Sequence, residues 1–166
     1  MVYLFRQEIF SPLKPRLEKW KLLEERKEII LYFSDRDGEY LIGEKRRIVR
    51  KADMKEEAKE VMNELIKGPS GRLTPTLPPR TKLLAIQLNE EGVAKVNFNK
   101  SLSKDHPGGS SAEIMTTYSI VNSLTLNFAK IKQVQILIEG RPIETIAGHL
   151  SLVRPLSPNP ALIKRQ

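Results

Sequence analysis

The sequence offers few side chains that could perform acid–base or metal chemistry. It contains two histidines, His106 and His149, and no cysteine. A Ser-His-Asp triad needs a hydroxyl beside an oriented imidazole, and no G-x-S-x-G motif is present. A metal site needs several convergent His or carboxylate ligands, and no such spacing occurs. We therefore expect no catalytic residue, no metal site and no cofactor. For a wall hydrolase, the least favoured function, the best candidates are Glu113, Glu144 and His149.

Glu113 has the most distinctive position of the acidic residues, because it follows Gly108-Gly109 at the start of a predicted helix. A helix N-terminus presents unpaired amides that can bind an anion. Ser110-x-x-Glu113 also matches a capping box, in which each side chain accepts a hydrogen bond from the other residue's backbone amide. A glutamate here would repel an incoming anion, so the sequence favours the capping box.

A tight basic run lies in a predicted strand over 39–50, in a chain whose formal net charge is +8. Alternation along a strand places Arg46 and Arg50 on one face and Lys45 and Arg47 on the other. One interpretation is a solvated edge strand that charge keeps soluble. The other is a binding patch for an anionic partner. The run consists of Lys45, Arg46, Arg47, Arg50 and Lys51, and its first four residues are the candidate interaction residues.

The second predicted helix, over 112–128, has a polar side without charge between Glu113 and Lys130. Its opposite side carries an apolar stripe at helical spacing. The polar side could be exposed for packing against a partner, or it could be covered by the chain's own loops. The candidate interaction residues on this side are Thr117, Asn122, Ser123 and Asn127.

The remaining pattern predicts an α+β fold with the element order ββα-ββα-ββ. An antiparallel or mixed sheet with two helices packed on one face is the simplest way to bury this pattern. Asp53 is expected to cap the first helix and Gly68-Pro69 to end it. The predicted strands cover 29–33, 39–50, 82–87, 93–98, 134–138 and 143–146, and the helices cover 54–67 and 112–128.

The chain divides into three parts. Residues 1–28 form a charged lead segment, expected to be juxtamembrane, with a short helix around Leu17 and Trp20. Residues 29–155 form the domain, and residues 156–166 form a proline-rich tail. No run of about 18 apolar residues is present, so the sequence predicts no membrane-spanning segment.

Nucleic acid is an unfavoured partner despite the basic composition. Gly68-Pro69-Ser70-Gly71 has the GxxG form of the loop in KH domains, which bind RNA. In KH domains a helix follows that loop directly. Here the next residues include Pro75, Pro78 and Pro79, which are incompatible with such a helix.

Several segments together resemble the GerMN domain of sporulation and spore-germination proteins. The resemblance covers roughly 29–155, and the ordered series is more specific than any single motif. It begins at Leu31-Tyr32-Phe33, continues through Glu64-Leu65-Ile66-Lys67-Gly68-Pro69 and Ala94-Lys95-Val96-Asn97-Phe98-Asn99, and includes Tyr118 to Thr125, Val134 to Gly140, Glu144-Thr145 and Gly148-His149.

The resemblance implies a fold similar to the ring-building domains of secretion and sporulation channels. It also implies a membrane-anchored protein in the periplasm or another extracytoplasmic space, without known catalytic residues. This sequence has neither a lipoprotein cysteine nor a signal segment. We expect a non-catalytic interaction and assembly module that binds envelope proteins or itself. The alternative is a module that binds peptidoglycan or an anionic membrane through its basic surface.

Overall fold

The computed structural model describes residues 25–165, which begin with a two-stranded sheet. Strand β1 (Arg26–Ser34) pairs antiparallel with β2 (Leu41–Val49). The intervening turn is closed by Asp35, whose Oδ1 accepts hydrogen bonds from the amides of Glu39 and Tyr40. The hairpin predicted from the sequence is therefore confirmed, and β1 starts slightly before the expected residue 29.

Helix α2 (Met54–Lys67) follows the hairpin, and local signals define both of its ends. The Asp53 side chain accepts a hydrogen bond from the Lys55 amide at 2.9 Å, as expected of an N-cap. Gly68 ends the helix in a conformation with φ +87°, which glycine adopts without strain. The buried side of α2 consists of Glu57, Ala58, Val61, Met62 and Leu65.

A four-stranded sheet forms the second half of the fold, in the order β3-β4-β5-β6. Strands β3 and β4 are antiparallel, whereas β4 and β5 are parallel. A parallel pair needs a long crossover connection, which α3 and α4 provide here. The bounds are β3 Leu83–Leu88, β4 Val93–Phe98, α3 Ser101–Lys104, α4 Ser110–Thr125, β5 Gln133–Ile138 and β6 Arg141–Pro142.

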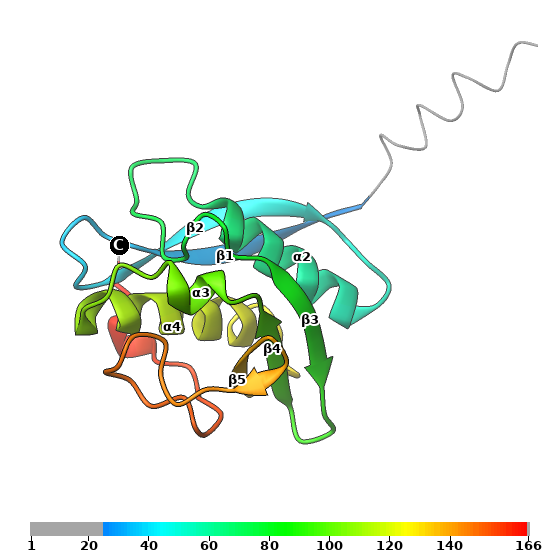
Figure 1. Ribbon diagram of the computed structural model, residues 1–166. Helices are drawn as coiled ribbons and strands as arrows, with labels where there is room; N and C mark the ends of the chain where they lie inside the picture. Colours follow the sequence, from blue (N-terminus) through cyan, green and yellow to red (C-terminus); the bar gives the residue numbers. More distant parts are fainter. Residues whose placement is uncertain (1–24, 166) are drawn as a thin grey trace, which may run out of the picture.

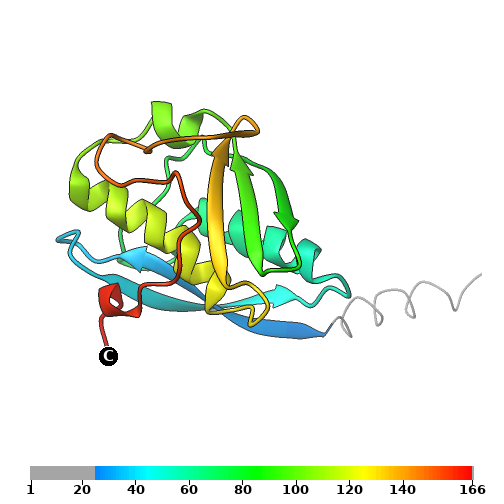
Figure 2. The ribbon, with the colours of Figure 1, turned by 90° about the horizontal axis from the view of Figure 1, so that it is seen from below.

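Helices α2 and α4 lie between the hairpin and the four-stranded sheet (Figure 1). Figure 2 shows α4 and α2 behind the strands of the second sheet. The α+β class predicted from the sequence is confirmed. The strands divide into two sheets, however, instead of one sheet with both helices on a single face. The reason is that α4 is buried almost all round and needs cover on opposite sides.

The predicted last strand, over 143–146, is wrong. Of residues 139–146, only Arg141–Pro142 pairs with β5. The following residues form a loop because the amides of Ile146 and Ala147 donate to the Glu113 carboxylate instead of to a neighbouring strand. A side chain from α4 thus replaces strand pairing in this segment.

The C-terminal tail folds back onto both sheets. Leu156 pairs with Val134 of β5, and Ile163 forms a parallel bridge with Leu41 of β2. A short 3₁₀ helix, η1 (Pro160–Leu162), lies between these two contacts. The short helix expected around Leu17 lies outside the described residues. None of the helices in residues 25–165 combines the length and hydropathy that a membrane crossing needs.

Candidate functional site

The polar side of α4 binds the main chain of β1 and is not an exposed surface. Asn127 accepts a hydrogen bond from the Ile30 amide at 3.0 Å and donates to the Ile30 carbonyl at 2.7 Å. Ser123 Oγ accepts from the Tyr32 amide at 3.1 Å. Of the two alternatives for this side, the structure shows cover by the chain itself, which leaves neither Ser123 nor the Asn127 amide available to a partner. Their role is to satisfy the edge of β1 where another strand would otherwise pair.

Ser119 belongs to the same row and was missed by the sequence analysis. Its hydroxyl donates to the Tyr32 carbonyl at 2.6 Å. Ser119 and Ser123 in α4, and Asn127 in the turn just after it, recur every four residues and so lie along one side. That spacing of small polar residues, beside an apolar stripe, was the available signal for a helix that lies along a strand edge.

Thr117 and Asn122 are also buried, so the alternative of cover by the chain itself holds for them too. Asn122 donates to the Asn159 carbonyl at 3.1 Å and accepts from the Asn159 amide at 2.9 Å. These two bonds hold the C-terminal tail against α4. Thr117 is fully buried, and its hydroxyl has no hydrogen-bond partner among residues 25–165.

Arg46 is likewise a structural residue. Its guanidinium donates to the Glu64 carbonyl at 3.0 Å, to the Glu64 carboxylate at 3.1 Å and to the Gly68 carbonyl at 3.0 Å, and it also pairs with Glu44. It lies over the Phe33 ring, 5.8 Å from the centroid. The side chain is only 16% exposed. Arg46 therefore connects β2 to the C-terminal end of α2, and its guanidinium is not available to a partner as expected from the sequence.

The carboxylates around Arg46 are held in their charged form. Burial alone would raise the pKa of Glu44, but hydrogen bonds from Arg46 and Ser70 outweigh it and lower the pKa. Burial alone would also raise the pKa of Glu64. Hydrogen bonds from Lys67 and Arg46 outweigh this effect and lower the pKa. The cluster is thus a charge-compensated brace.

Lys45, Arg47, Arg50 and Lys51 are the exposed members of the basic run, and the first three are candidate interaction residues. Lys45 Nζ lies 3.1 Å from Glu28, and Arg50 Nη1 lies 2.6 Å from Glu25. Such exposed pairs contribute about 0–1 kcal/mol and exchange readily with other partners. Within residues 25–165, Arg47 has no ion-pair partner. The interaction surface expected from the sequence thus reduces to these three side chains.

Glu113 is completely buried and does not form the expected capping box. The N-cap of α4 is Gly109, without a side-chain hydrogen bond. Glu113 instead accepts from the amides of Ile146 and Ala147, both at 2.9 Å, and from the His149 amide at 2.8 Å. The prediction failed because the donors come from a loop more than thirty residues away.

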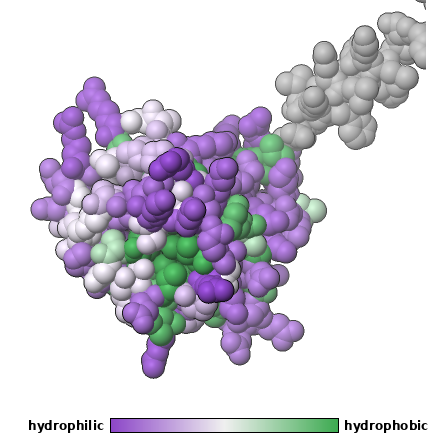
Figure 3. Space-filling view, in the orientation of Figure 1, coloured by the Kyte–Doolittle hydropathy of each residue, from purple (hydrophilic) through white to green (hydrophobic). Residues whose placement is uncertain are grey.

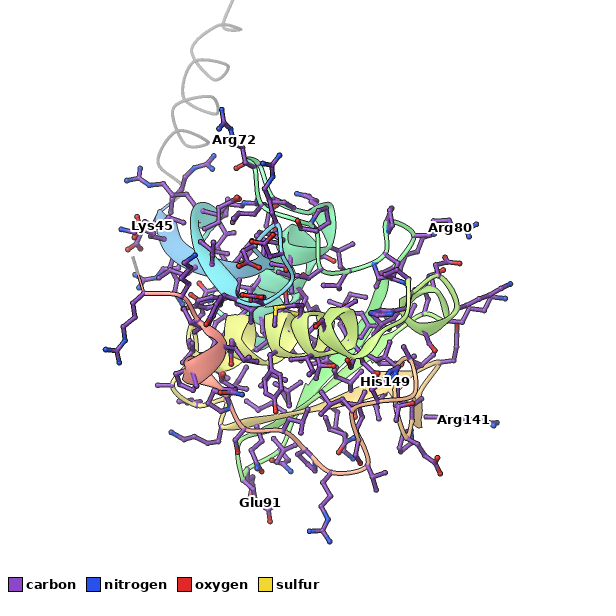
Figure 4. All side chains as sticks on the ribbon, turned by 90° about the vertical axis from the view of Figure 1, so that its left-hand side faces the viewer. Lys45, Arg72, Arg80, Glu91, Arg141 and His149 are labelled. Atoms are coloured by element: carbon purple, nitrogen blue, oxygen red, sulfur yellow. The ribbon has the colours of Figure 1, made fainter. Side chains whose placement is uncertain are left out.

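The hydrolase candidates converge only in part. His149 Nδ1 lies 3.1 Å from Glu113 Oε2, and Figure 4 shows His149 next to the first half of α4. Burial alone would raise the pKa of Glu113, but the loop amides, including those of Ala147 and His149, outweigh it and lower the pKa. Glu144 is exposed and makes no hydrogen bond to either residue. Glu113 thus acts as an acceptor that organises the loop.

His106 forms part of a buried hydrogen-bond chain. Thr116 Oγ1 donates its only proton to the Thr76 carbonyl at 2.6 Å. It must therefore accept a hydrogen bond from Nε2 of His106, which lies 3.0 Å away. Nδ1 of His106 accepts from the Gly108 amide at 3.0 Å. These contacts fit the neutral imidazole. Burial lowers the pKa of His106 despite the opposing effect of Glu113, so the neutral form is favoured.

A hollow of about 500 Å³ lies at the end of the fold where the β1–β2 turn approaches the start of α4. Residues of intermediate hydropathy gather on this side in Figure 3, at the left of the view. Two of the acidic side chains at the hollow are already engaged: Asp35 closes the turn, and Asp105 pairs with Arg80 at 2.9 Å. No group of three His, Asp or Glu side chains suited to a metal occurs within residues 25–165.

Comparison with known proteins defines the fold family. The family model described as Germane, sporulation and spore germination, matches residues 30–144. The first GerMN domain of the sporulation protein GerM from Bacillus subtilis is 19% identical, with a TM-score of 0.65, covering 79% of this chain and 97% of that chain. The tandem GerMN domains of GerM are 17% identical, with a TM-score of 0.61, covering 80% of this chain and 46% of that one.

A protein from Clostridium perfringens described as a candidate lipoprotein is 24% identical, with a TM-score of 0.58, covering 81% of this chain and 89% of that chain. A search of curated proteins gives no significant match. At these identities the solved structures establish the shared fold, and the family model covers well over half of the sequence. The chain therefore belongs to the Germane family of sporulation and spore germination proteins.

Proposed function

We propose that this domain is a non-catalytic interaction module of the cell envelope, working outside the cytoplasm in a membrane-anchored protein. Family membership supports a connection with sporulation or germination. The similarity to a candidate lipoprotein supports an extracytoplasmic location. The partner is another envelope protein or a second copy of the domain.

The arrangement of the polar residues supports a scaffold role. Glu113 is occupied by loop amides, and His106 is fixed in a neutral hydrogen-bonded form. A general acid or base needs a free position facing a substrate. These groups instead connect α4 to loops of the same chain.

One observation carries the proposed binding surface: β2 is the outer strand of a two-stranded sheet and exposes Lys45 and Arg47 along it. Exposed charges at an edge steer association and select partners of opposite charge. Figure 4 places Lys45 on the hairpin, far from Glu91 at the other end of the molecule. The two positions therefore offer a matched comparison.

Site-specific photocross-linking in cells of the source organism tests this proposal. A photoreactive residue at position 45 is expected to give one discrete adduct, identified by mass spectrometry as an envelope protein or as the domain itself. The same residue at position 91 serves as the control. Equal, diffuse cross-linking at both positions, or adducts with cytoplasmic proteins alone, would contradict the proposed function.

Binding to peptidoglycan or an anionic membrane is the competing function, and the net charge of +8 favours it. Glu28 and Glu25 offset part of the charge along β2, which argues against it there. Sedimentation with peptidoglycan or with phosphatidylglycerol vesicles distinguishes the two functions. Charge-driven binding must appear at low salt and weaken strongly at physiological ionic strength, where the screening length is about 8 Å.

A further inference from the structure

The two edges of β1 can be assigned from its hydrogen bonds. The main-chain groups of Ile30 and Tyr32 point toward α4, where Asn127 and Ser123 bind them. Successive residues of a strand direct their main-chain groups to opposite sides. The intervening residues of β1 therefore pair with β2, and the α4 side of β1 is closed to any further strand.

The outer edge of β2 follows from the same alternation. The Leu41 carbonyl accepts from the Lys164 amide at 2.9 Å, so the main chain of Leu41 points away from β1. Gly43, Lys45 and Arg47 share its direction. Among residues 25–165, no backbone group donates to or accepts from these three. As far as the described part of the chain goes, the edge of β2 beyond Leu41 is therefore open to a pairing strand.

The side chains along this edge determine which strand fits. Lys45 and Arg47 are exposed, and Arg50 follows just beyond the strand. Pairing β2 with β2 of a second copy would bring these positive charges together, and like charges across a strand pair are destabilising. Acidic side chains of a partner could instead compete with Glu28 for Lys45. That ion pair is accessible, because the Lys45 side chain is 71% exposed and the Glu28 side chain is 51% exposed.

We propose that β2 binds an extended acidic segment of a partner protein, which adds to the hairpin as a third strand beside Gly43, Lys45 and Arg47. This inference rests on the proposed interaction function and specifies its partner. Main-chain hydrogen bonds provide the pairing, as in other cases of strand addition. The basic side chains select the charge. The isolated bridge between Ile163 and Leu41 shows that main-chain pairing already occurs at one end of this edge.

A proline substitution separates main-chain pairing from charge. Lys45→Pro removes an amide that points outward, so the β1–β2 ladder stays intact, and proline is tolerated on edge strands in this orientation. Lys45→Ala removes the same charge but keeps the amide. Arg47→Pro is a second variant that removes both a charge and an outward-pointing amide. Circular dichroism and the protection of the Glu44 and Arg46 amides verify that each variant is folded.

The probe is a short capped peptide in which threonine alternates with glutamate, and the control peptide has lysine in place of glutamate. Binding is followed by amide hydrogen exchange in the full chain. With the acidic peptide, exchange at Gly43, Lys45 and Arg47 is expected to slow by about tenfold or more, with little change at Glu44 and Arg46. The control peptide is expected to give no protection.

The affinity of the variants for the acidic peptide distinguishes strand addition through the main chain from binding by charge alone. Lys45→Pro and Arg47→Pro are expected to abolish binding, whereas Lys45→Ala is expected to weaken it by about fivefold, as for loss of one exposed pair. Equal losses in Lys45→Pro and Lys45→Ala, or no protection at saturating peptide, would overturn strand addition. If the cellular cross-link at position 45 persists in that case, the interaction function stands and only this mode of binding fails.

Discussion

Replacing Glu113 by glutamine tests how far one buried carboxylate organises the loop after β6. Oε1 accepts the amides of Ile146 and Ala147, and Oε2 accepts the His149 amide and lies 3.1 Å from its ring Nδ1. Glutamine has the same shape but only one oxygen. Whichever way the amide turns, its NH₂ group faces backbone donors, which then lose their acceptor.

The magnitude follows from the orphaned donors. Each buried donor left without a partner costs about 1–3 kcal/mol, so we expect Glu113→Gln to lower the free energy of unfolding by about 2–4 kcal/mol. For a chain of this size each kcal/mol corresponds to about 2–4 °C in Tm, giving a decrease of about 5–15 °C. Glu144→Gln, at an exposed position nearby, is expected to change stability by less than about 0.5 kcal/mol.

Urea unfolding and amide exchange together measure the effect. In Glu113→Gln, exchange should accelerate first at Ile146, Ala147 and His149, because the loop opens before the core. A decrease of less than about 1 kcal/mol in the free energy of unfolding, with unchanged exchange at these amides, would refute the role of Glu113 in holding the loop. It would mean that packing, and not the carboxylate, holds the loop.

The pH dependence gives an independent check on Glu113. Its pKa in the folded chain is lowered from the ordinary value of 4.5, because the loop amides outweigh the effect of burial. A lowered folded pKa stabilises the protein above the unfolded value and loses this contribution as pH falls through the folded value. The contribution of Glu113 to stability should therefore be flat above about pH 5 and be lost in acid, and Glu113→Gln should reduce the fall in stability below that pH.

Two further substitutions, each with its own control variant, test a hydrogen bond to β1 and the steric limit at a tight turn. Asn127→Ala leaves main-chain groups of β1 unpaired and should cost about 1–3 kcal/mol in urea unfolding, whereas Asn63→Ala, at an exposed position of α2, should cost almost nothing. Gly92→Ala should cost about 2 kcal/mol or more, because φ is +85° and the new Cβ would lie 2.9 Å from a backbone oxygen. Gly71→Ala meets no atom within 4 Å and should be neutral by thermal unfolding; a comparable loss there would contradict the steric argument.

Local elements were predictable because their signals are contained in short segments. The turn after Ser34, the cap at Asp53 and the end of α2 at Gly68 depend on neighbouring residues alone, and all three are confirmed. The failures occur where a distant group competes with a local preference. Glu113 could satisfy a nearby amide, but the loop amides from Ile146 onward bind it instead.

The amino-acid sequence by itself determined the family, through its ordered series of motifs. It also determined the α+β class and the positions of most strands and helices, because hydrophobic periodicity and turn chemistry act over a few residues. Tertiary structure alone decided which polar residues face inward. The polar side of α4 has the same composition whether it meets solvent or protein, and only the edge of β1, at Ile30 and Tyr32, makes it internal. Those hydrogen bonds join residues about ninety positions apart, so no local pattern could distinguish a buried row from an exposed one.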